Sequence, residues 1–384
     1  TRVMTGVAPI AARRDAPAGG ADVRRALVVC DMWYGSNGFA GAKALRRANW
    51  DVAVVPEWEL VPIKWRTLAM RLLARATRSL AVREFNLELL RQTERWLPGL
   101  VLVFKGMFVQ AETLRRLRAK GIRVYCFYPD VSFRAHGPYL PKALPEYDWV
   151  FTTKSFGLHD MREQLGVRNA SLLLHGFDPD VHRPRVLTAD DRRRFGCDVC
   201  FIGTWSPKKE RLIAALRTAR PNLHVRVWGE QWSSARHPAL ADGVIGGHEI
   251  VGDQYAKAIA ASRINLAILS ERRRGSSSGD RITSRTFHIP AAGGFMLHER
   301  TDEVTSLFRD GVECVCYDGE EELVQAVDTY VTDDERREAI ADRGRELVWS
   351  RDSWDHRIRE IIATHDSMIP DAATQRHRVE RGAL

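Results

Sequence analysis

Residues 278–294, SGDRITSRTFHIPAAGG, combine acidic, basic, imidazole and glycine residues in one short stretch. Two arginines, together with the N-terminus of a helix beginning near residue 283, could hold a pyrophosphate. The aspartate beside them can accept hydrogen bonds from sugar hydroxyls, and the histidine can bond a ribose hydroxyl through one ring nitrogen. The alternative interpretation is a solvated loop with a surface histidine. The candidate binding residues are Asp280, Arg281, Ser284, Arg285 and His288.

A second candidate phosphate site is GTWSPKK, residues 203–209, which follows the strand-like run CDVCFIG. Its glycine permits a tight turn, Ser206 is a good N-cap, and Pro207 suits the first position of a helix. A helix N-terminus with lysines beside it attracts phosphate, although an ordinary turn with solvated lysines fits the same residues. We assign to this site, and to the end of the next strand-like run, Gly203, Thr204, Lys209, Trp228 and Gly229.

Carboxylates end two strand-like runs of the first half: Asp31 ends ALVVCD, and Asp130 ends RVYCFYPD. A carboxylate in such a place can act as a base or position a hydroxyl, although Asp is also a common N-cap or turn residue after a strand. The loop MWYGSNGFAG mixes aromatic and small polar residues, which suits a sugar acceptor, and its alternative is a glycine-rich turn. The candidate acceptor-binding residues are Trp33, Tyr34, Ser36 and Asn37.

The sequence offers little evidence of a metal site. It contains no P-loop and no HExxH, and no Asp-x-Asp follows a strand-like run, so we expect no metal requirement. Cys197 and Cys200 form the only pair with metal-like spacing, and no second CxxC or histidine pair accompanies them. We therefore expect the six cysteines to be buried thiols, with zinc or redox chemistry as the alternative.

The composition is globular, with 45% hydrophobic and 28% charged residues, and the net charge is +9. A basic balance favours anionic partners such as phosphates, membrane headgroups or nucleic acid, without choosing among them. No apolar run of about 18 residues occurs, and the first 22 residues lack the apolar core of a signal peptide, so we expect a cytoplasmic protein. Residues 64–83 predict a basic amphipathic helix, which either packs on the core or docks on the inner face of an anionic membrane or on a phosphorylated acceptor.

Short apolar runs alternate with helical patterns in both halves of the chain, which predicts two α/β domains with parallel, doubly wound sheets. The strand-like runs are 26–31, 51–55, 100–105, 123–130 and 148–153, then 197–203, 224–229, 264–269, 293–299 and 314–319. Ligands of such sheets bind at the carboxyl ends of the strands. The predicted organisation is a disordered leader (1–22), a first domain (23–180), a linker (181–196), a second domain (197–347), a C-terminal helix (348–368) and a frayed tail (369–384).

Taken in order, several stretches resemble the CgeB-like, or spore-maturation type, glycosyltransferases, which are relatives of the large family with the GT-B fold. The resemblance covers about residues 26–365. It is carried by stretches such as YDWVFTTKSFGLHDMREQLGV, HGFDPDVHRP, DVCFIGTWSPKKERL, VRVWGEQW, SRTFHIPAAGGFML and FRDGVECVCYDGEEELVQAV. The resemblance implies two Rossmann-like domains facing a cleft, the first for an acceptor and the second for a nucleotide sugar. It also implies that the C-terminal helix crosses back to the first domain.

The resemblance implies roles for single residues as well. In the wider family, a Glu-x7-Glu pair holds the donor sugar and the nucleotide ribose, and Asp280 and His288 stand at these two positions here. Both depart from glutamate, so we expect the preference for ribose or donor to differ. Lys209 matches a lysine that contacts phosphate in the family.

These observations predict an enzyme that moves a sugar from a nucleotide diphosphate, with UDP preferred, to a hydroxyl of a glycan, lipid-linked or small-molecule acceptor. The resemblance favours retention of the anomeric configuration, whereas inversion would need Asp130 or Asp31 as base. No cofactor is expected beyond the donor. Two alternatives remain: a non-hydrolysing nucleotide-sugar epimerase of the same fold, and a non-catalytic protein that binds an anionic surface or nucleic acid. Because the sequence has no nucleic-acid-binding motif, we expect no nucleic-acid partner.

Overall fold

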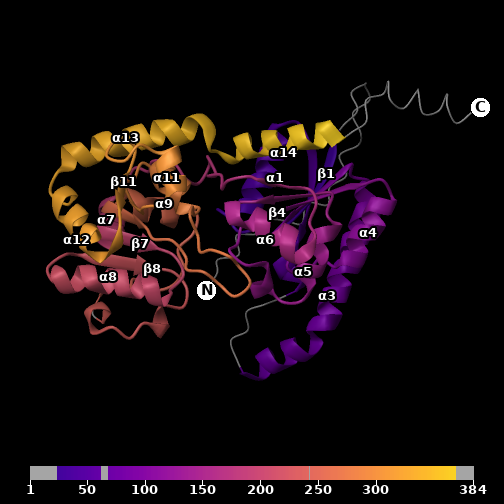
Figure 1. The fold of residues 1–384 in the computed structure, drawn as a ribbon, viewed down its shortest axis with the longest axis horizontal. Helices are drawn as coiled ribbons and strands as arrows, with labels where there is room; N and C mark the ends of the chain where they lie inside the picture. Colours follow the sequence, from indigo (N-terminus) through magenta and orange to yellow (C-terminus); the bar gives the residue numbers. More distant parts are fainter. Residues whose placement is uncertain (1–23, 62–67, 242, 369–384) are drawn as a thin grey trace, which may run out of the picture.

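In the computed structural model, residues 24–61, 68–241 and 243–368 are described. They form two α/β domains that lie side by side along the long axis of the molecule (Figure 1). The first contains a six-stranded sheet of order β2-β1-β3-β4-β5-β6, and the second a five-stranded sheet of order β11-β10-β9-β7-β8. Neighbouring strands pair in parallel throughout both sheets. The predicted pair of Rossmann-like domains is confirmed.

The strands of the first domain form where apolar residues run without interruption. All residues of LVLVF in β3 are buried, as expected for a parallel sheet covered by helices on both faces. The strands are β1 (Arg25–Cys30), β2 (Asp51–Pro56), β3 (Leu100–Phe104), β4 (Arg123–Tyr128), β5 (Trp149–Thr152) and β6 (Ala170–Leu172). The helices are α1 (Asn37–Arg47), α2 (Glu57–Leu60), α3 (Leu68–Trp96), α4 (Ala111–Ala119), η1 (Phe133–His136), α5 (Tyr139–Ala143), η2 (Leu144–Glu146) and α6 (Ser155–Leu165).

The second domain repeats the same alternation of strand and helix. Its strands are β7 (Cys197–Ile202), β8 (Val225–Trp228), β9 (Ser262–Ala267), β10 (Met296–Glu299) and β11 (Val315–Tyr317). Its helices are α8 (Pro207–Ala219), η3 (Trp232–Ser234), η4 (Pro238–Leu240), α9 (Asp253–Ala260), α10 (Arg285–Ala291), α11 (Asp302–Leu307), α12 (Gly319–Tyr330) and α13 (Asp334–Arg351). The six cysteines are buried free thiols.

The predicted linker between the two sheets contains a helix that was not expected from the sequence. The segment 181–196 contains the helix α7 (Ala189–Phe195), which begins with a reciprocal capping box between Thr188 and Asp191. Strand β6, at the edge of the first sheet, was also not predicted.

The C-terminal helix α14 (Trp354–Met368) leaves the second domain and lies along the first, whereas α13 lies along the second (Figure 1). Trp354 anchors it in the first core, with its ring 5.0 Å from that of Phe127 and 5.3 Å from that of Phe104. Arg357 donates to the backbone carbonyl of Leu174 at 3.1 Å and forms an ion pair with Asp352 at 2.6 Å.

The predicted basic helix of residues 64–83 is described only in part. Lys64 and Trp65 lie outside the described residues, and α3 begins at Leu68. Leu80, expected on the apolar face, is 65% exposed, whereas Val82 is buried in the core of the first domain. Among the described residues, no helix is both long enough and apolar enough to cross a bilayer.

Candidate functional site

A pocket of about 190 Å³ lies where the two domains meet, at the carboxyl ends of β7 and β8. Residues before and inside α9 and α10 form further walls, and Trp33 reaches it from the first domain. Of the residues predicted from sequence, those that line the pocket are Trp33, Gly203, Thr204, Gly229, Ser284, Arg285 and His288. The predicted donor and acceptor elements therefore meet at one place.

Arg285, the first residue of α10, is the central cation of this pocket. Its Nη2 donates to the carbonyl of Ile268 at 2.7 Å, and its Nη1 to that of Ile202 at 3.4 Å. The guanidinium thereby joins the carboxyl ends of β7 and β9, and it lies over the ring of Phe201 at 5.2 Å. Burial lowers the pKa of Arg285 from its ordinary value. A buried guanidinium at the start of a helix is suited to bind an anion.

Lys209, in the first turn of α8, lies next to this cation without lining the pocket wall. Its ammonium donates to the carbonyl of Thr204 at 3.0 Å and to the hydroxyl of Ser270 at 3.4 Å. Burial, and then the charge of Arg285, lower the pKa of Lys209 to about 7. The lysine is thus held close to its protonation midpoint at neutral pH.

His288 is buried, so the alternative of a surface histidine is wrong. Its ring stacks on that of His182 with centroids 3.8 Å apart and an angle of 14°. Its Nε2 lies 3.3 Å from the carbonyl oxygen of Gly176, and Tyr255 meets the ring edge-on at 5.9 Å. Burial lowers the pKa of His288 to about 4, so the ring is neutral at neutral pH.

Asp280 does not line the pocket, and its carboxylate is bound by a lysine of the first domain. Its carboxylate forms an ion pair with Lys154 at 2.6 Å, and both side chains are nearly buried. Lys154, just before α6, also donates to the carbonyl of Ile282 at 3.2 Å. A sugar hydroxyl that bonds to Asp280 must therefore share this carboxylate with an ammonium from the opposite domain.

Two other predicted donor residues lie away from the pocket. The side chain of Arg281 is half exposed, with Nη1 3.7 Å from the carboxylate of Glu303. Trp228 is buried and packs against Phe195. Gly229 has a structural reason to be glycine: its φ is +143°, and a Cβ would lie 2.1 Å from the carbonyl oxygen of Gly203.

Asp130, the first candidate base, is bound by two neighbours. Its Oδ2 lies 2.8 Å from the ammonium of Lys105 and 2.8 Å from Nε2 of His136. Burial alone would raise the pKa of Asp130, but these two partners outweigh it and lower the pKa below the ordinary value. Lys105 adopts a left-handed backbone with φ +70°, a conformation that usually needs a functional reason in a non-glycine residue. Asp130 is therefore a firmly ionised carboxylate and a weak proton acceptor.

The predicted acceptor loop serves mostly to start α1. Ser36 is its N-cap: Oγ accepts from the backbone N–H of Phe39 at 3.1 Å and donates to the carbonyl of Asp31 at 2.7 Å. Asn37 is the first helical residue, and the Tyr34 hydroxyl donates to the carbonyl of Asp180 at 3.4 Å. Trp33 alone of these four side chains lines the pocket.

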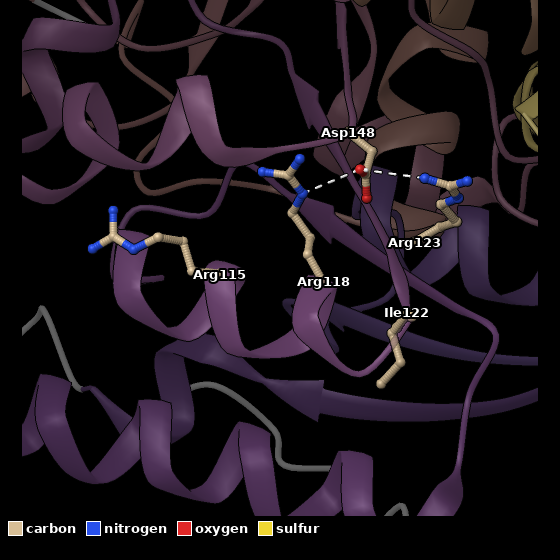
Figure 2. A pocket seen from close by; sticks show the side chains of 6 residues that line it. Arg115, Arg118, Ile122, Arg123 and Asp148 are labelled. Atoms are coloured by element: carbon tan, nitrogen blue, oxygen red, sulfur yellow. Dashed lines mark hydrogen bonds and ion pairs between the residues drawn. The ribbon is translucent and has the colours of Figure 1, made fainter.

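A larger hollow, of about 390 Å³, lies at the opposite ends of the first-domain strands. Figure 2 shows Arg118 and Arg123 reaching Asp148 from two sides, at 3.2 and 3.6 Å, whereas Arg115 points away from it. Asp148 also accepts from the backbone N–H of Val124 at 2.9 Å. These charges satisfy one another and fix the start of β4, so we assign this hollow a structural role.

Sequence reasoning missed several residues of the site. Lys154 and His182 follow strand-like or linker segments, and their partners lie more than one hundred residues away. The only signals in the sequence were their positions, directly after the run DWVFTT and within HGFDPDVHRP. The pocket residues that were not predicted include His182, Glu230, Glu249 and Tyr255.

Comparisons with known proteins agree with this architecture. Residues 206–363, less than half of the chain, match a family described as Glycosyl transferase-like. No curated protein matches the sequence. Sucrose-phosphate synthase from Thermosynechococcus elongatus superposes with a TM-score of 0.65 at 10% identity, covering 90% of this chain and 99% of the other. Anabaena HepE in complex with UDP-glucose gives 0.61 at 12% identity, covering 89% and 100%.

A putative UDP-N-acetylglucosamine 2-epimerase from Listeria monocytogenes gives a TM-score of 0.53 at 11% identity, covering 90% of this chain and 96% of the other. At such identities the likeness concerns the fold alone. The two parallel sheets and the superpositions define the class: this chain has the GT-B fold. More particularly, most of its second domain, together with the start of the crossing helix, is similar to the family described as Glycosyl transferase-like.

Proposed function

We propose that this protein is a nucleotide-sugar-dependent glycosyltransferase that uses Arg285 to bind the diphosphate of its donor. The observation that carries the proposal is the buried guanidinium at the start of α10, in a pocket at the carboxyl ends of β7 and β8. The glycosyl transferase-like match over residues 206–363 supports it. HepE, with the same fold, was solved with UDP-glucose, which supports a uridine diphosphate sugar as the donor.

In this proposal the cations stabilise the charge that develops on the leaving diphosphate. Arg285 contacts it directly, and Lys209 becomes fully protonated as the anion arrives. His288 offers one neutral ring face and one hydrogen bond to the ribose in place of a carboxylate. Asp280 orients the sugar from its place beside Lys154.

Further parts of the proposal rest on the sequence resemblance. They are membership of the CgeB-like group and retention of the anomeric configuration. Transfer without a metal is also proposed, and it rests on the absence of an Asp-x-Asp after a strand-like run. Peripheral attachment to an anionic membrane through residues 64–83 is also proposed, and it is supported by the exposed side chains of Arg75, Arg78 and Leu80 on α3.

The test is a thermal-shift screen with UDP, GDP, ADP, CMP and dTDP and with the corresponding nucleotide sugars. A ligand present at a hundredfold excess over its dissociation constant stabilises the folded state by about 2.7 kcal/mol. We expect one base to raise the melting temperature, and Arg285→Lys and His288→Ala to lose most of that rise. Arg263→Ala, an exposed arginine of β9, is the matched control and should keep it. If no nucleotide or nucleotide sugar shifts the wild-type protein, the proposal fails.

A further inference from the structure

The loop of residues 270–281, called here the cross-domain loop, leaves the second domain after β9 and reaches the first (Figure 1). The first domain holds its backbone at several points. The hydroxyl of Ser132 donates to the carbonyl of Arg274 at 2.6 Å, and the amide of Gln164 to that of Gly275 at 3.1 Å. The buried carboxylate of Asp160 accepts from the N–H of Ser277 at 2.8 Å. The loop is therefore fixed across the junction.

Three consecutive arginines, Arg272, Arg273 and Arg274, stand on this fixed backbone with exposed side chains. Arg272 donates Nε to the carbonyl of Ser276 at 2.9 Å. Within the ranges that the structure describes, no carboxylate lies within ion-pairing distance of any of the three guanidinium groups. Many other surface arginines of this chain have an acidic partner, such as Arg220 with Asp328. Unpaired cations on a rigid backbone are suited to an external anion.

The position of the three arginines connects them with the first domain. The carbonyl of Arg274 is held by Ser132, immediately before η1, and η1 ends in His136 beside Asp130 and Lys105. The side chain of Arg134, also exposed, packs against Gly275. The arginines thus lie between the donor domain and the strand ends at which an acceptor of the first domain would bind.

We propose that the cross-domain loop is the binding site for the phosphate group of the acceptor, so that the acceptor is a phosphate-bearing molecule. The inference rests on the proposed glycosyltransferase function. Arg272, Arg273 and Arg274 bind the phosphate, and the fixed backbone places the acceptor hydroxyl toward the donor pocket. A phosphate carried by a free sugar phosphate and one in a lipid headgroup present the same chemistry to these arginines.

The chain contains its own matched control, a second run of three exposed arginines at residues 192–194 on α7. We would compare the wild type with two triple variants, R272Q/R273Q/R274Q and R192Q/R193Q/R194Q, which lose the same charge. Binding is measured by calorimetry with glucose 6-phosphate, with glucose as the uncharged control. Sedimentation with phosphatidylcholine vesicles, with and without phosphatidylglycerol, tests the lipid source. Circular dichroism verifies that both variants are folded.

We expect the wild type to bind at least one of the two anionic probes more tightly than the corresponding control, which is glucose or the vesicle of zero net charge. The cross-domain loop variant should lose about tenfold or more in affinity, while the α7 variant keeps it. Loss with glucose 6-phosphate alone indicates a free acceptor, and loss with vesicles alone indicates a lipid-linked one. The proposal is overturned if the wild type binds neither probe, if both variants lose affinity equally, or if the cross-domain loop variant binds both probes as tightly as the wild type. No nucleotide is present in these assays, so their failure is distinct from failure of the donor screen.

Discussion

Donor binding should be coupled to proton uptake by Lys209. Its pKa of about 7 lies far below the ordinary 10.5, because burial and the neighbouring Arg285 oppose a second positive charge. A diphosphate in the pocket reverses that balance and raises the pKa well above 8. At pH 8 only about a tenth of the free protein carries this proton, so binding takes up about 0.9 proton; at pH 6 it takes up about 0.1. The dissociation constant should rise about tenfold per pH unit above 7.

The assay is calorimetric titration with the nucleotide sugar that gives the largest thermal shift, since its diphosphate has no proton to lose in this range. The observed enthalpy is measured in Tris and in HEPES at pH 6 and pH 8, and the buffer difference gives the protons taken up. Lys209→Met should abolish the uptake at pH 8 and flatten the pH dependence of affinity. Lys208→Met, which removes the neighbouring ammonium, should keep both. Equal uptake at the two pH values, or uptake that persists in Lys209→Met, would refute the assigned environment.

The same lysine has a consequence for folding. Its pKa is lower in the folded than in the unfolded state, so the unfolded chain binds more protons between about pH 7 and 10.5. The contribution of Lys209 to the free energy of unfolding therefore rises with pH across this window. In Lys209→Met this part of the slope should disappear.

Three further predictions concern stability, each measured by urea denaturation. Gly229→Ala should cost more than about 3 kcal/mol, because its Cβ would lie 2.1 Å from a carbonyl oxygen, whereas Gly311→Ala, with φ +75° and open space around it, should cost about 1 kcal/mol. Lys154→Met should lower the free energy of unfolding by about 3–5 kcal/mol, because it leaves the buried carboxylate of Asp280 unpaired. The double variant with Asp280→Asn should recover most of this loss. If the effects of the two substitutions simply add, the ion pair is contradicted. Burial raises the pKa of Glu57 to about 8, so wild-type stability should fall between about pH 4.5 and 8 as the unfolded state ionises first; Glu57→Gln should remove this fall, and an unchanged slope would contradict it.

The sheets could be predicted because a strand buried on both faces shows a continuous apolar run: β3 is buried throughout, and β1 and β4 are buried after their first residue, an arginine. Strand β6 was missed because it has three residues at an edge, none of them buried, and therefore shows no such run. Helix α7 was missed because its sequence, ADDRRRF, is mostly charged and shows no apolar periodicity, although a capping box precedes it.

The site could be predicted where one local stretch of sequence combines residue types that suit a phosphate or a sugar. Arg285 and His288 were found in this way, because both belong to the stretch SGDRITSRTFHIPAAGG, and α10 places both at the pocket. Lys154 pairs with Asp280 of the other domain, and His182 stacks on His288. Both contacts join residues that are far apart in the chain, so the local sequence does not indicate them. The hydroxyl of Ser36, which we predicted to contact an acceptor, also caps α1, and the local sequence fits both roles.

The path of α14 has a consequence for how this chain is synthesised. Trp354, Ile358 and Ile361 belong to the same hydrophobic core as β1 and β3 of the first domain. On the ribosome, the first six strands emerge long before these side chains exist, so an apolar surface of the early domain stays uncovered while the whole second domain is translated. Of these two domains, the first is synthesised earlier and completed later. Truncation before α14 should therefore damage the N-terminal half of the protein more than the C-terminal half from which residues are removed.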